Sequence, residues 1–404
     1  MTTTKPTSDE GVEVPKRLPY VERIFETFDE MELNEQLLRG IYSLGFEKPS
    51  SIQKRAIVPV TQNYDIIAQS QSGTGKTATF TIGCLQQIDR EIVSPQLVIL
   101  SPTRELAKQN HRVCVDLAEY LDLKICLCIG GESTESNTKE LDSGAHIVIG
   151  TPGRVGDLLG KYILKLNHIR SMVLDEADEM LTSGFKEQVY NIFEYLPPVT
   201  DDVPSYQICL FSATMPAEVL DLTEEFMKDP VRILVKNEEL TLEGIKQYFV
   251  AVEKETYKFD TLCDIYTHLT VDQAIIYTNT KRKAEWLAER LRGSDFSVIF
   301  IHSDMTQRDR NKVIRDFKTG DERILIATDI VARGIDVQQV SLVINYDLPK
   351  FKETYIHRIG RSGRYGRKGL AINMATHGDL KLIETYKNFY RTKIDELPMS
   401  LSDI

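Results

Sequence analysis

Short runs of consecutive apolar residues, rich in valine and isoleucine, recur along this chain of 404 residues. Between them lie stretches with a helical spacing of apolar positions, such as residues 281–292. Continuous apolar strands that alternate with helices are typical of parallel sheets covered on both faces. The expected strands form two sets of five: 65–68, 96–100, 146–150, 171–174 and 207–211, then 273–277, 297–301, 323–328, 341–345 and 369–374.

A charged stretch without any strand-like run, residues 234–244, separates the two sets. The pattern therefore predicts an α/β protein of two domains joined by a short linker, in keeping with roughly 150 residues per domain. We expect a disordered N-terminal tail over 1–27, a first domain over 28–235, a linker over 236–243 and a second domain over 244–404.

Composition changes this picture only slightly. The chain has no run of about 18 apolar residues, so no membrane span is expected. The polar, proline-containing N-terminus is unlike a secretory signal. The six cysteines do not form a zinc-binding set, and we expect them to be small buried side chains. A net charge of −11 argues against nucleic-acid binding through bulk charge, so any such site has to be built from particular residues.

Polar motifs begin at or just after the expected strand ends, which is where open α/β sheets bind ligands. The most informative is AQSQSGTGKTATF, residues 68–80, which reads as a strand, a glycine-rich turn and a helix. Gly75, Lys76 and Thr77 fit a phosphate-binding loop, although Ser70 stands where the usual pattern has its first glycine. Backbone N–H groups of such a turn bind phosphate, Lys76 suits the β- and γ-phosphates, and Thr77 suits Mg²⁺.

Two carboxylates follow the expected strand at 171–174, namely Asp175 and Glu176 in the sequence DEAD. A carboxylate in that place can hold Mg²⁺, and its neighbour can orient and deprotonate an attacking water. We assign Asp175 to the metal and Glu176 to the base. An isolated DEAD would be a solvated acidic turn, but the phosphate loop upstream favours the catalytic interpretation.

From about Phe28 to the C-terminus, the chain resembles the DEAD-box RNA helicases. The motifs that carry the resemblance stand in the family's order: GFEKPSSIQ (45–53), AQSQSGTGKT (68–77), PTREL (102–106), GG (130–131), TPGR (151–154), DEAD (175–178), SAT (212–214), ARGID (332–336) and HRIGRSGR (357–364). In this family the position of Ser70 need not be glycine. The resemblance implies two RecA-like domains, each a parallel sheet flanked by helices, and RNA-stimulated hydrolysis of ATP with Mg²⁺.

The resemblance also implies roles for residues around the nucleotide. Gln53 reads adenine, Phe46 stacks on it and Lys48 lies nearby, while Phe28 either supports this pocket or belongs to the core. Arg361 and Arg364 act as fingers from the second domain, with Asp336 and His357 in the same network, so ATP is hydrolysed only when the cleft closes. The implied ATP-binding set is Phe46, Lys48, Gln53, Ser72, Gly73, Thr74, Gly75, Lys76, Thr77, Ala78, Asp336, Arg361 and Arg364. The implied catalytic residues are Lys76, Arg361 and Arg364 of this set together with the base, Glu176. The implied metal ligands are Thr77 and Asp175.

Two further sets of residues are implied in the same way. Asp178 and the SAT motif, Ser212, Ala213 and Thr214, couple hydrolysis to unwinding, the alternative for SAT being a plain helix cap. The RNA-binding set is Arg104, Gly130, Gly131, Thr151, Pro152, Gly153 and Arg154 in the first domain, and Thr280, Arg282, Gln307, Arg310, Thr328, Arg333 and Gly334 in the second. Contacts to phosphate and the 2′-hydroxyl make RNA binding independent of sequence. Few aromatic residues adjoin these motifs, so base stacking is not expected to dominate.

The motifs YIHRIGR, SLVINYDLP and LPMSLSDI favour the subgroup of eukaryotic translation initiation factor 4A. That subgroup implies a cytoplasmic, monomeric helicase that unwinds short duplexes in messenger RNA, works with an initiation scaffold and accessory factors, and needs no membrane. The stretches VAVEKETYKFDTLC and NTKRK instead resemble the nuclear exon-junction clamp. Two other classes are a scaffold with an inactive nucleotide site, which intact Lys76 and Glu176 argue against, and a DNA helicase or transport ATPase. Ser303, where relatives carry glycine, and the acidic residues 132–137 depart from the family pattern.

Overall fold

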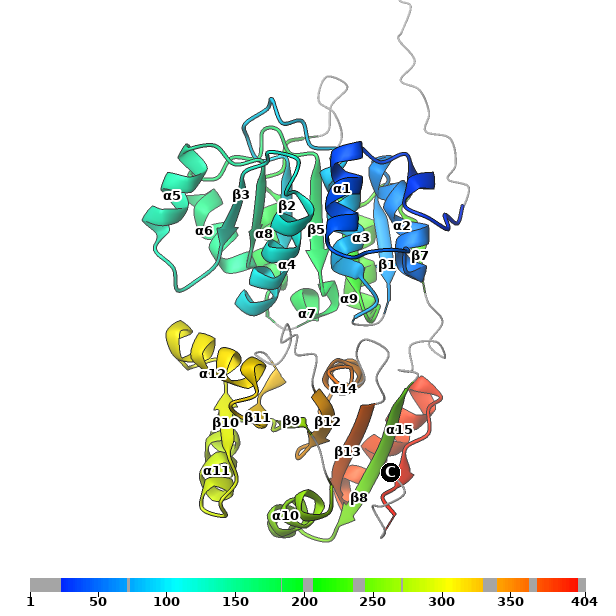
Figure 1. Cartoon of the computed structure of the whole chain (residues 1–404), viewed down its shortest axis with the longest axis vertical. Coiled ribbons are helices and arrows are strands. Elements are labelled where there is room, and N and C mark those ends of the chain that lie inside the picture. Colours follow the sequence, from blue (N-terminus) through cyan, green and yellow to red (C-terminus); the bar gives the residue numbers. More distant parts are fainter. Residues whose placement is uncertain are drawn as a thin grey trace, which may run out of the picture.

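The computed structural model describes residues 23–70, 73–182, 184–198, 206–234, 244–269, 272–329, 340–362 and 369–398. It shows two α/β domains, one above the other, each built on a seven-stranded parallel sheet (Figure 1). The predicted fold class is therefore confirmed. The expected site residues Ser72, Arg333, Gly334, Asp336 and Arg364 lie outside the described residues, as does the whole of the expected linker, 236–243.

The first sheet has the strand order β3-β4-β2-β5-β6-β1-β7. Its strands are β1 (Ile66–Gln69), β2 (Leu97–Leu100), β3 (Ile125–Cys128), β4 (Ile147–Gly150), β5 (Ser171–Asp175), β6 (Gln207–Ser212) and β7 (Val231–Ile233). Successive side chains of a strand point to opposite faces, so Leu97 and Ile99 join one apolar core while Val98 and Leu100 join the other. Phe25 already packs into the first of these cores, and its N–H donates to the Lys54 carbonyl.

Helices cover both faces of this sheet. The core that contains Leu97 is closed by η1 (Asp29–Met31), α1 (Glu35–Ser43), α2 (Ser51–Thr61), α3 (Lys76–Leu85) and α4 (Arg104–Leu117). The opposite core is closed mainly by α6 (Pro152–Gly160), α7 (Ala177–Thr182), α8 (Lys186–Phe193) and α9 (Ala217–Phe226), with α5 (Thr134–Asp142) beside β3. Because both faces are covered, the central strands are apolar throughout, which is why their sequences read as unbroken runs.

The second sheet has the order β10-β11-β9-β12-β13-β8-β14. Its strands are β8 (Ile245–Val252), β9 (Gln273–Tyr277), β10 (Val298–Ile301), β11 (Ile324–Ala327), β12 (Val340–Asn345), β13 (Gly369–Thr376) and β14 (Asp395–Glu396). Around it lie η3 (Glu255–Tyr257), α10 (Lys258–His268), α11 (Lys281–Arg292), α12 (Gln307–Thr319), α14 (Lys352–Ile359), η4 (His377–Asp379) and α15 (Leu380–Tyr390). Its core falls into three apolar clusters between helices and sheet.

All ten predicted strands are present, and four further strands extend the sheets, namely β3, β7, β8 and β14. Three of these lie at sheet edges and β8 lies next to one. β7, β8 and β14 are partly exposed and contain polar residues, so they lack the unbroken apolar run that marks a central strand. In β8, for example, exposed and partly buried positions separate buried ones. β3 is a short apolar run that the prediction missed.

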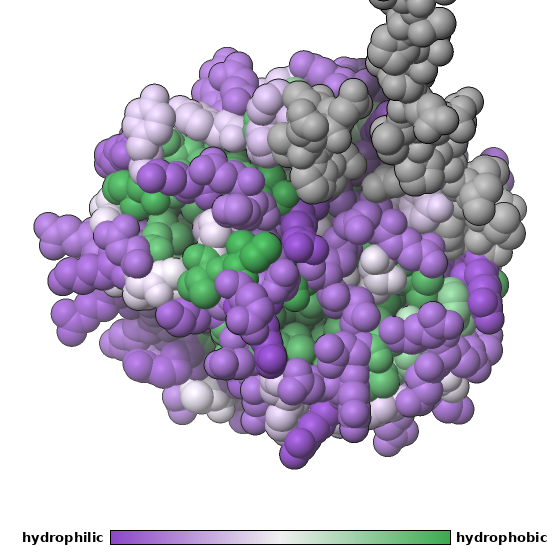
Figure 2. Space-filling view, turned by 90° about the horizontal axis from the view of Figure 1, so that it is seen from above, coloured by the Kyte–Doolittle hydropathy of each residue, from purple (hydrophilic) through white to green (hydrophobic). Residues whose placement is uncertain are grey.

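The strands of the first sheet point with their carboxyl ends towards the second domain, and α12 and α14 of the second domain lie against the first domain (Figure 1). The opposite face of the first domain is largely hydrophilic, with hydrophobic residues visible only in separate patches (Figure 2). In the part of the chain that the structure describes, no helix combines the length and the apolar character that crossing a membrane requires.

Candidate functional site

The phosphate loop lies between β1 and α3, as predicted. Gly73 and Gly75 have φ values of +84° and +97°, a backbone conformation that side chains with a Cβ adopt only with strain. Ser70, the residue at the anomalous position, shares a hydrogen bond of 2.6 Å with the Thr74 hydroxyl. Ser70 therefore closes the loop through its side chain. The N-terminus of α3 begins directly after Gly75, so its free N–H groups and dipole are available to an anion.

Lys76 opens helix α3, and its ammonium group is buried beside the DEAD motif. Its Nζ lies 3.4 Å from Glu176 Oε2, and Lys76 is only 6% exposed. An ion pair of this kind holds the lysine close to the loop until a phosphate competes for it. Ala78, in the same first turn of α3, is buried and packs into the first core.

Asn110 links the two predicted metal ligands, and sequence analysis did not single it out. Its Nδ2 donates to Asp175 Oδ2 (2.8 Å), and its Oδ1 accepts from the Thr77 hydroxyl (3.2 Å). Asn110 is fully buried on α4, so the only sequence signal was a polar residue on the apolar face of an amphipathic helix. A hydroxyl and a carboxylate brought together in this way form the oxygen donor set that Mg²⁺ prefers.

The two carboxylates of the DEAD motif have opposite electrostatic environments. Burial, aided by the neighbouring charge of Glu176, raises the pKa of Asp175 to about 7. Burial also acts to raise the pKa of Glu176, but Lys76, His357 and Arg361 outweigh it and lower that pKa. Glu176 also has a φ of +53°, which is rare for a residue other than glycine and is typical of functional sites.

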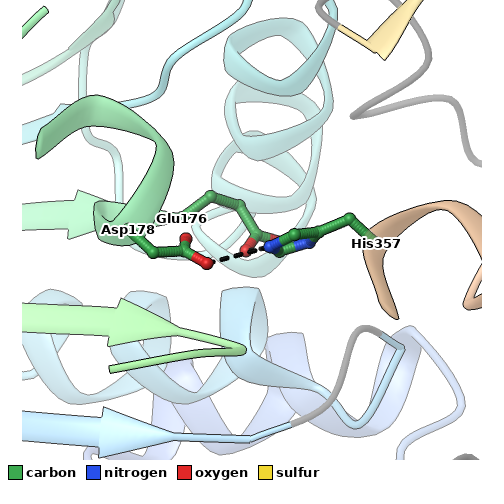
Figure 3. A group of neighbouring side chains, drawn as sticks. All are labelled: Glu176, Asp178 and His357. Atoms are coloured by element: carbon green, nitrogen blue, oxygen red, sulfur yellow. Dashed lines mark hydrogen bonds and ion pairs between the residues drawn. The ribbon is translucent and has the colours of Figure 1, made fainter. Parts of the chain in front are cut away.

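His357 of the second domain reaches directly into the first domain (Figure 3). Its Nε2 lies 2.9 Å from Asp178 Oδ2 and its Nδ1 lies 4.0 Å from Glu176 Oε2. Asp178 in turn accepts a hydrogen bond from the Thr214 hydroxyl, and the Thr214 N–H donates to Ser212 Oγ (3.3 Å). These five residues form one buried network, and Ala213 joins it to β1 because its carbonyl accepts from the Gln69 amide (3.2 Å). The structure thus brings the predicted coupling residues together.

Arg361 lies at the same junction. Its Nε donates to the His357 carbonyl (3.1 Å), and it is 5% exposed. Its charge contributes to the lowered pKa of Glu176, so this arginine acts on the predicted catalytic base from the other domain. A fixed guanidinium there can stabilise charge on a transferring phosphoryl group.

At the other end of the loop, Gln53 is buried on α2 and sits over Gly75. Its Oε1 accepts from the Ser50 N–H (2.7 Å), and a Cβ on Gly75 would lie 2.8 Å from Gln53 Nε2. Gln53 therefore touches the phosphate loop as well as capping its own helix. Phe46 packs partly buried against the first core and Lys48 is exposed. Phe28 is fully buried, with its ring edge-on to Tyr42, so it belongs to the core.

A hollow of about 470 Å³ lies between the domains on the side of α12. Most of the predicted RNA-binding residues of the first domain line it, together with two residues of the second. The lining includes Arg104, Gly130, Thr151, Gly153, Arg154, Ser303 and Arg310. Pro152 is buried at the first position of α6 and is not part of this surface. A second hollow, of about 410 Å³, continues the surface over the second domain past Thr280, Arg282, Ser303 and Thr328.

Several of the predicted RNA-binding residues also connect the domains. Arg104 Nη1 donates to Gln307 Oε1 (3.0 Å), and Arg310 Nη2 lies 2.6 Å from Glu105 Oε2 in a buried ion pair. The glycine pair admits the arginine, because Cβ atoms on Gly130 and Gly131 would both lie 2.9 Å from the Arg104 guanidinium. These glycines therefore allow close approach, as predicted, but to a protein side chain.

The unusual polar segment at 132–137 positions Arg154. The Arg154 guanidinium donates to Asn137 Oδ1 and to the Glu132 carbonyl, both at 2.7 Å. Asn137 is 1% exposed and also donates to the Leu127 carbonyl (2.9 Å). This departure from the family pattern thus holds a predicted RNA-binding arginine in place.

Comparison with known proteins agrees with this geometry. The model of the DEAD/DEAH box helicase domain matches residues 50–222, and that of the helicase conserved C-terminal domain matches residues 257–366. The ATP-dependent RNA helicase fal1 of Aspergillus fumigatus is 54% identical over 378 residues, which cover 94% of each chain.

Two solved structures show how the domains are placed. S. cerevisiae Dbp5 bound to RNA and ADP BeF3 is 35% identical, with a TM-score of 0.85 over 93% of this chain and 96% of that one. A DEAD box protein from the hyperthermophile Methanococcus jannaschii is 38% identical but has a TM-score of 0.53, over 93% of this chain and 100% of that one. At similar identity, the two domains are arranged here as in the Dbp5 complex. The motifs, the two-domain fold and these relatives together show that the chain belongs to the DEAD-box family of ATP-dependent RNA helicases.

Proposed function

We propose that this helicase separates short RNA duplexes by closing its two domains around one strand and around ATP, and releases that strand after hydrolysis. The observation that carries the proposal is the buried network in which His357 meets Asp178 and Glu176 across the cleft. Because the catalytic carboxylate and its partners come from different domains, the site is complete only in the closed arrangement.

In the closed site, the backbone N–H groups around Gly73 and Gly75 and the N-terminus of α3 hold the phosphates. Lys76 exchanges its ion pair with Glu176 for the β- and γ-phosphates, which frees Glu176 to orient a water and take its proton. Arg361 supplies positive charge to the transferring group. Thr77 and Asp175 would hold Mg²⁺, which would neutralise charge on the phosphate oxygens.

The same contacts can couple ATP hydrolysis to release of the RNA strand. Loss of the γ-phosphate changes the charge beside Glu176, which lies next to His357 on α14 of the second domain. His357 also contacts Asp178, which binds Thr214 at the end of β6, so the same change alters the contacts of the first domain. Opening of the cleft then separates Arg104 from Gln307 and divides the surface on which the strand lies. Because this surface is made of arginines, threonines and helix ends, RNA binding is independent of sequence.

For the cellular process we propose preparation of messenger RNA for translation initiation, in the cytoplasm, together with an initiation scaffold. The sequence motifs shared with that subgroup support this proposal. The stretch 250–263, VAVEKETYKFDTLC, favours a second candidate, a nuclear clamp that stays on spliced RNA. The two candidates differ in whether the protein leaves the RNA after hydrolysis.

The biochemical test compares RNA with DNA of the same sequence. We expect RNA to stimulate ATP hydrolysis and DNA not to, and duplexes of about one helical turn to be unwound faster than longer ones. RNA that stays bound after hydrolysis would support the clamp. In a translation extract depleted of this protein, adding it back should restore a reporter with a structured leader, whereas Glu176→Gln protein should not. A reporter that never depended on the protein would contradict the initiation proposal.

A further inference from the structure

The second domain has a hollow of about 530 Å³ that the ATP and RNA motifs do not explain. It lies between the start of α10 and the outer side of α11, with Phe259, Trp286, Arg290 and Tyr346 among its lining residues. Its volume falls within the range of about 300 to 1,000 Å³ that is typical of small-ligand sites. The hollow is therefore large enough for a nucleotide.

Trp286 is the residue in this hollow that is best suited to contact a ligand. It is the single tryptophan of the chain, and 42% of it is exposed. Its ring stands edge-on to Phe259, with centroids 6.3 Å apart, so packing supports the ring without covering it. The Arg290 guanidinium lies 4.3 Å from the Phe259 centroid and 5.5 Å from that of Trp286. An aromatic ring beside a guanidinium is a typical platform for a nucleobase.

The hollow also continues the predicted RNA surface. Thr280 and Arg282 line both this hollow and the one that contains Thr328, and Ser303 joins the latter to the hollow between the domains. The three hollows thus form one track from Arg154 of the first domain to Trp286 of the second. The N-terminus of α11 lies on this track, directly after Thr280.

The charges along this end of the track suit a polyanion. Lys283 is neutralised by Glu255 and Asp347, each 2.7 Å away. Arg282 is exposed and has no ion pair with any described residue, and Arg290 contacts aromatic rings. The end of the track therefore has free positive charge next to an aromatic surface, which is the combination found in single-strand binding grooves.

We propose that the Trp286 hollow is a stacking subsite for one base of the bound strand, at the end of the track on the second domain. The inference rests on the proposed function, because it assumes that the strand occupies the other two hollows. It adds one stacking position to a surface on which stacking is not expected to dominate, because the tryptophan lies close to Thr280 in the fold. A base seated there extends the footprint and fixes where the strand ends.

The experiment uses the full chain with a non-hydrolysable ATP analogue and labelled uridine oligonucleotides of about 4 to 16 nucleotides, the range of single-strand sites. Anisotropy should show an affinity gain once the strand reaches the subsite. Trp286→Leu should remove this gain, about 5- to 150-fold as expected for one stacked base, and leave the shorter oligonucleotides unaffected. Trp286→Phe should retain most of it, and Glu289→Gln, on the same helix, is the matched control.

Intrinsic fluorescence gives a direct readout, because Trp286 is the only tryptophan. We expect its emission to be quenched by the longer oligonucleotides only, and an abasic nucleotide at the terminal position to abolish the quenching. Equal loss of affinity for short and long strands would overturn a terminal subsite. Absence of quenching, with RNA binding intact, would also overturn it and leave the hollow to a protein partner. Failure of the wild-type chain to bind any oligonucleotide would instead remove the proposed function.

Discussion

The ion pair between Arg310 and Glu105 gives the sharpest test of how the two domains close. Both side chains are over 90% buried, and Arg310 Nη2 lies 2.6 Å from Glu105 Oε2 across the cleft. Arg310→Met would leave Glu105 buried without its cation. Removing one partner of a buried pair costs about 3–5 kcal/mol. Gln307, which still donates to Glu105 (3.3 Å), offsets part of this cost.

The penalty applies only to the closed arrangement, because water solvates Glu105 when the domains separate. We therefore take the lower end of the range, about 3 kcal/mol, which corresponds to roughly a 100-fold shift of the closing equilibrium towards the open form. Closure can be followed by energy transfer between two dyes, one on each domain. Arg310→Met should need about 100-fold more RNA than the wild type to reach the same energy transfer. ATP affinity of the first domain should be unchanged, since the phosphate loop lies entirely within that domain.

Two further variants test the reasoning. Arg308→Met, on the exposed side of the same helix, should close like the wild type. Glu105→Leu combined with Arg310→Met should close more readily than Arg310→Met alone, because an apolar pair has no unpaired charge to bury. If the double variant is as defective as the single one, the loss belongs to an RNA contact of Arg310. If Arg310→Met closes at the wild-type RNA concentration, the ion pair does not stabilise the closed form.

Four other predictions concern the site and the core. Glu176→Gln should bind ATP and RNA but lower hydrolysis at least about 100-fold, the contribution of a general base; turnover at the wild-type rate would remove Glu176 from that role. The pKa of Asp175 is raised to about 7 in the folded chain. Between the ordinary pKa of an aspartate and pH 7, the folded state therefore binds a proton that the unfolded state has lost, so stability falls as the pH rises through this range. Asp175→Asn should therefore raise the free energy of unfolding at pH 8 but not near pH 4, as chemical denaturation can measure. Gly131→Ala, at a φ of +85° and beside Arg104, should destabilise the chain by about 1–2 kcal/mol in the same assay, whereas the exposed Glu135→Ala should not. Cys263 alone is partly exposed, so a thiol reagent should modify at most this cysteine in the folded chain and all six after denaturation; fast reaction of a second thiol would contradict the described burial.

Much of the fold could be predicted because it depends on local properties of the sequence. Central strands are buried on both faces, so each appears as an unbroken apolar run. β7, β8 and β14, at or next to a sheet edge, could not be found in this way, since they are partly exposed and contain polar residues. The phosphate loop was equally visible, because one short segment supplies the strand end, the glycines, Lys76 and Thr77.

The sequence by itself determined the two parallel sheets, the nucleotide loop and the order of the helicase motifs. Only the tertiary structure decided how these parts meet. Asn110 joins Asp175 from 65 residues away and Arg310 joins Glu105 from 205 residues away, and neither contact leaves any periodic or local pattern in the chain. Such pairs form because parallel strands bring their carboxyl ends to one edge and the second domain faces that edge. The tertiary structure also places the only tryptophan of the chain at the end of the proposed RNA track.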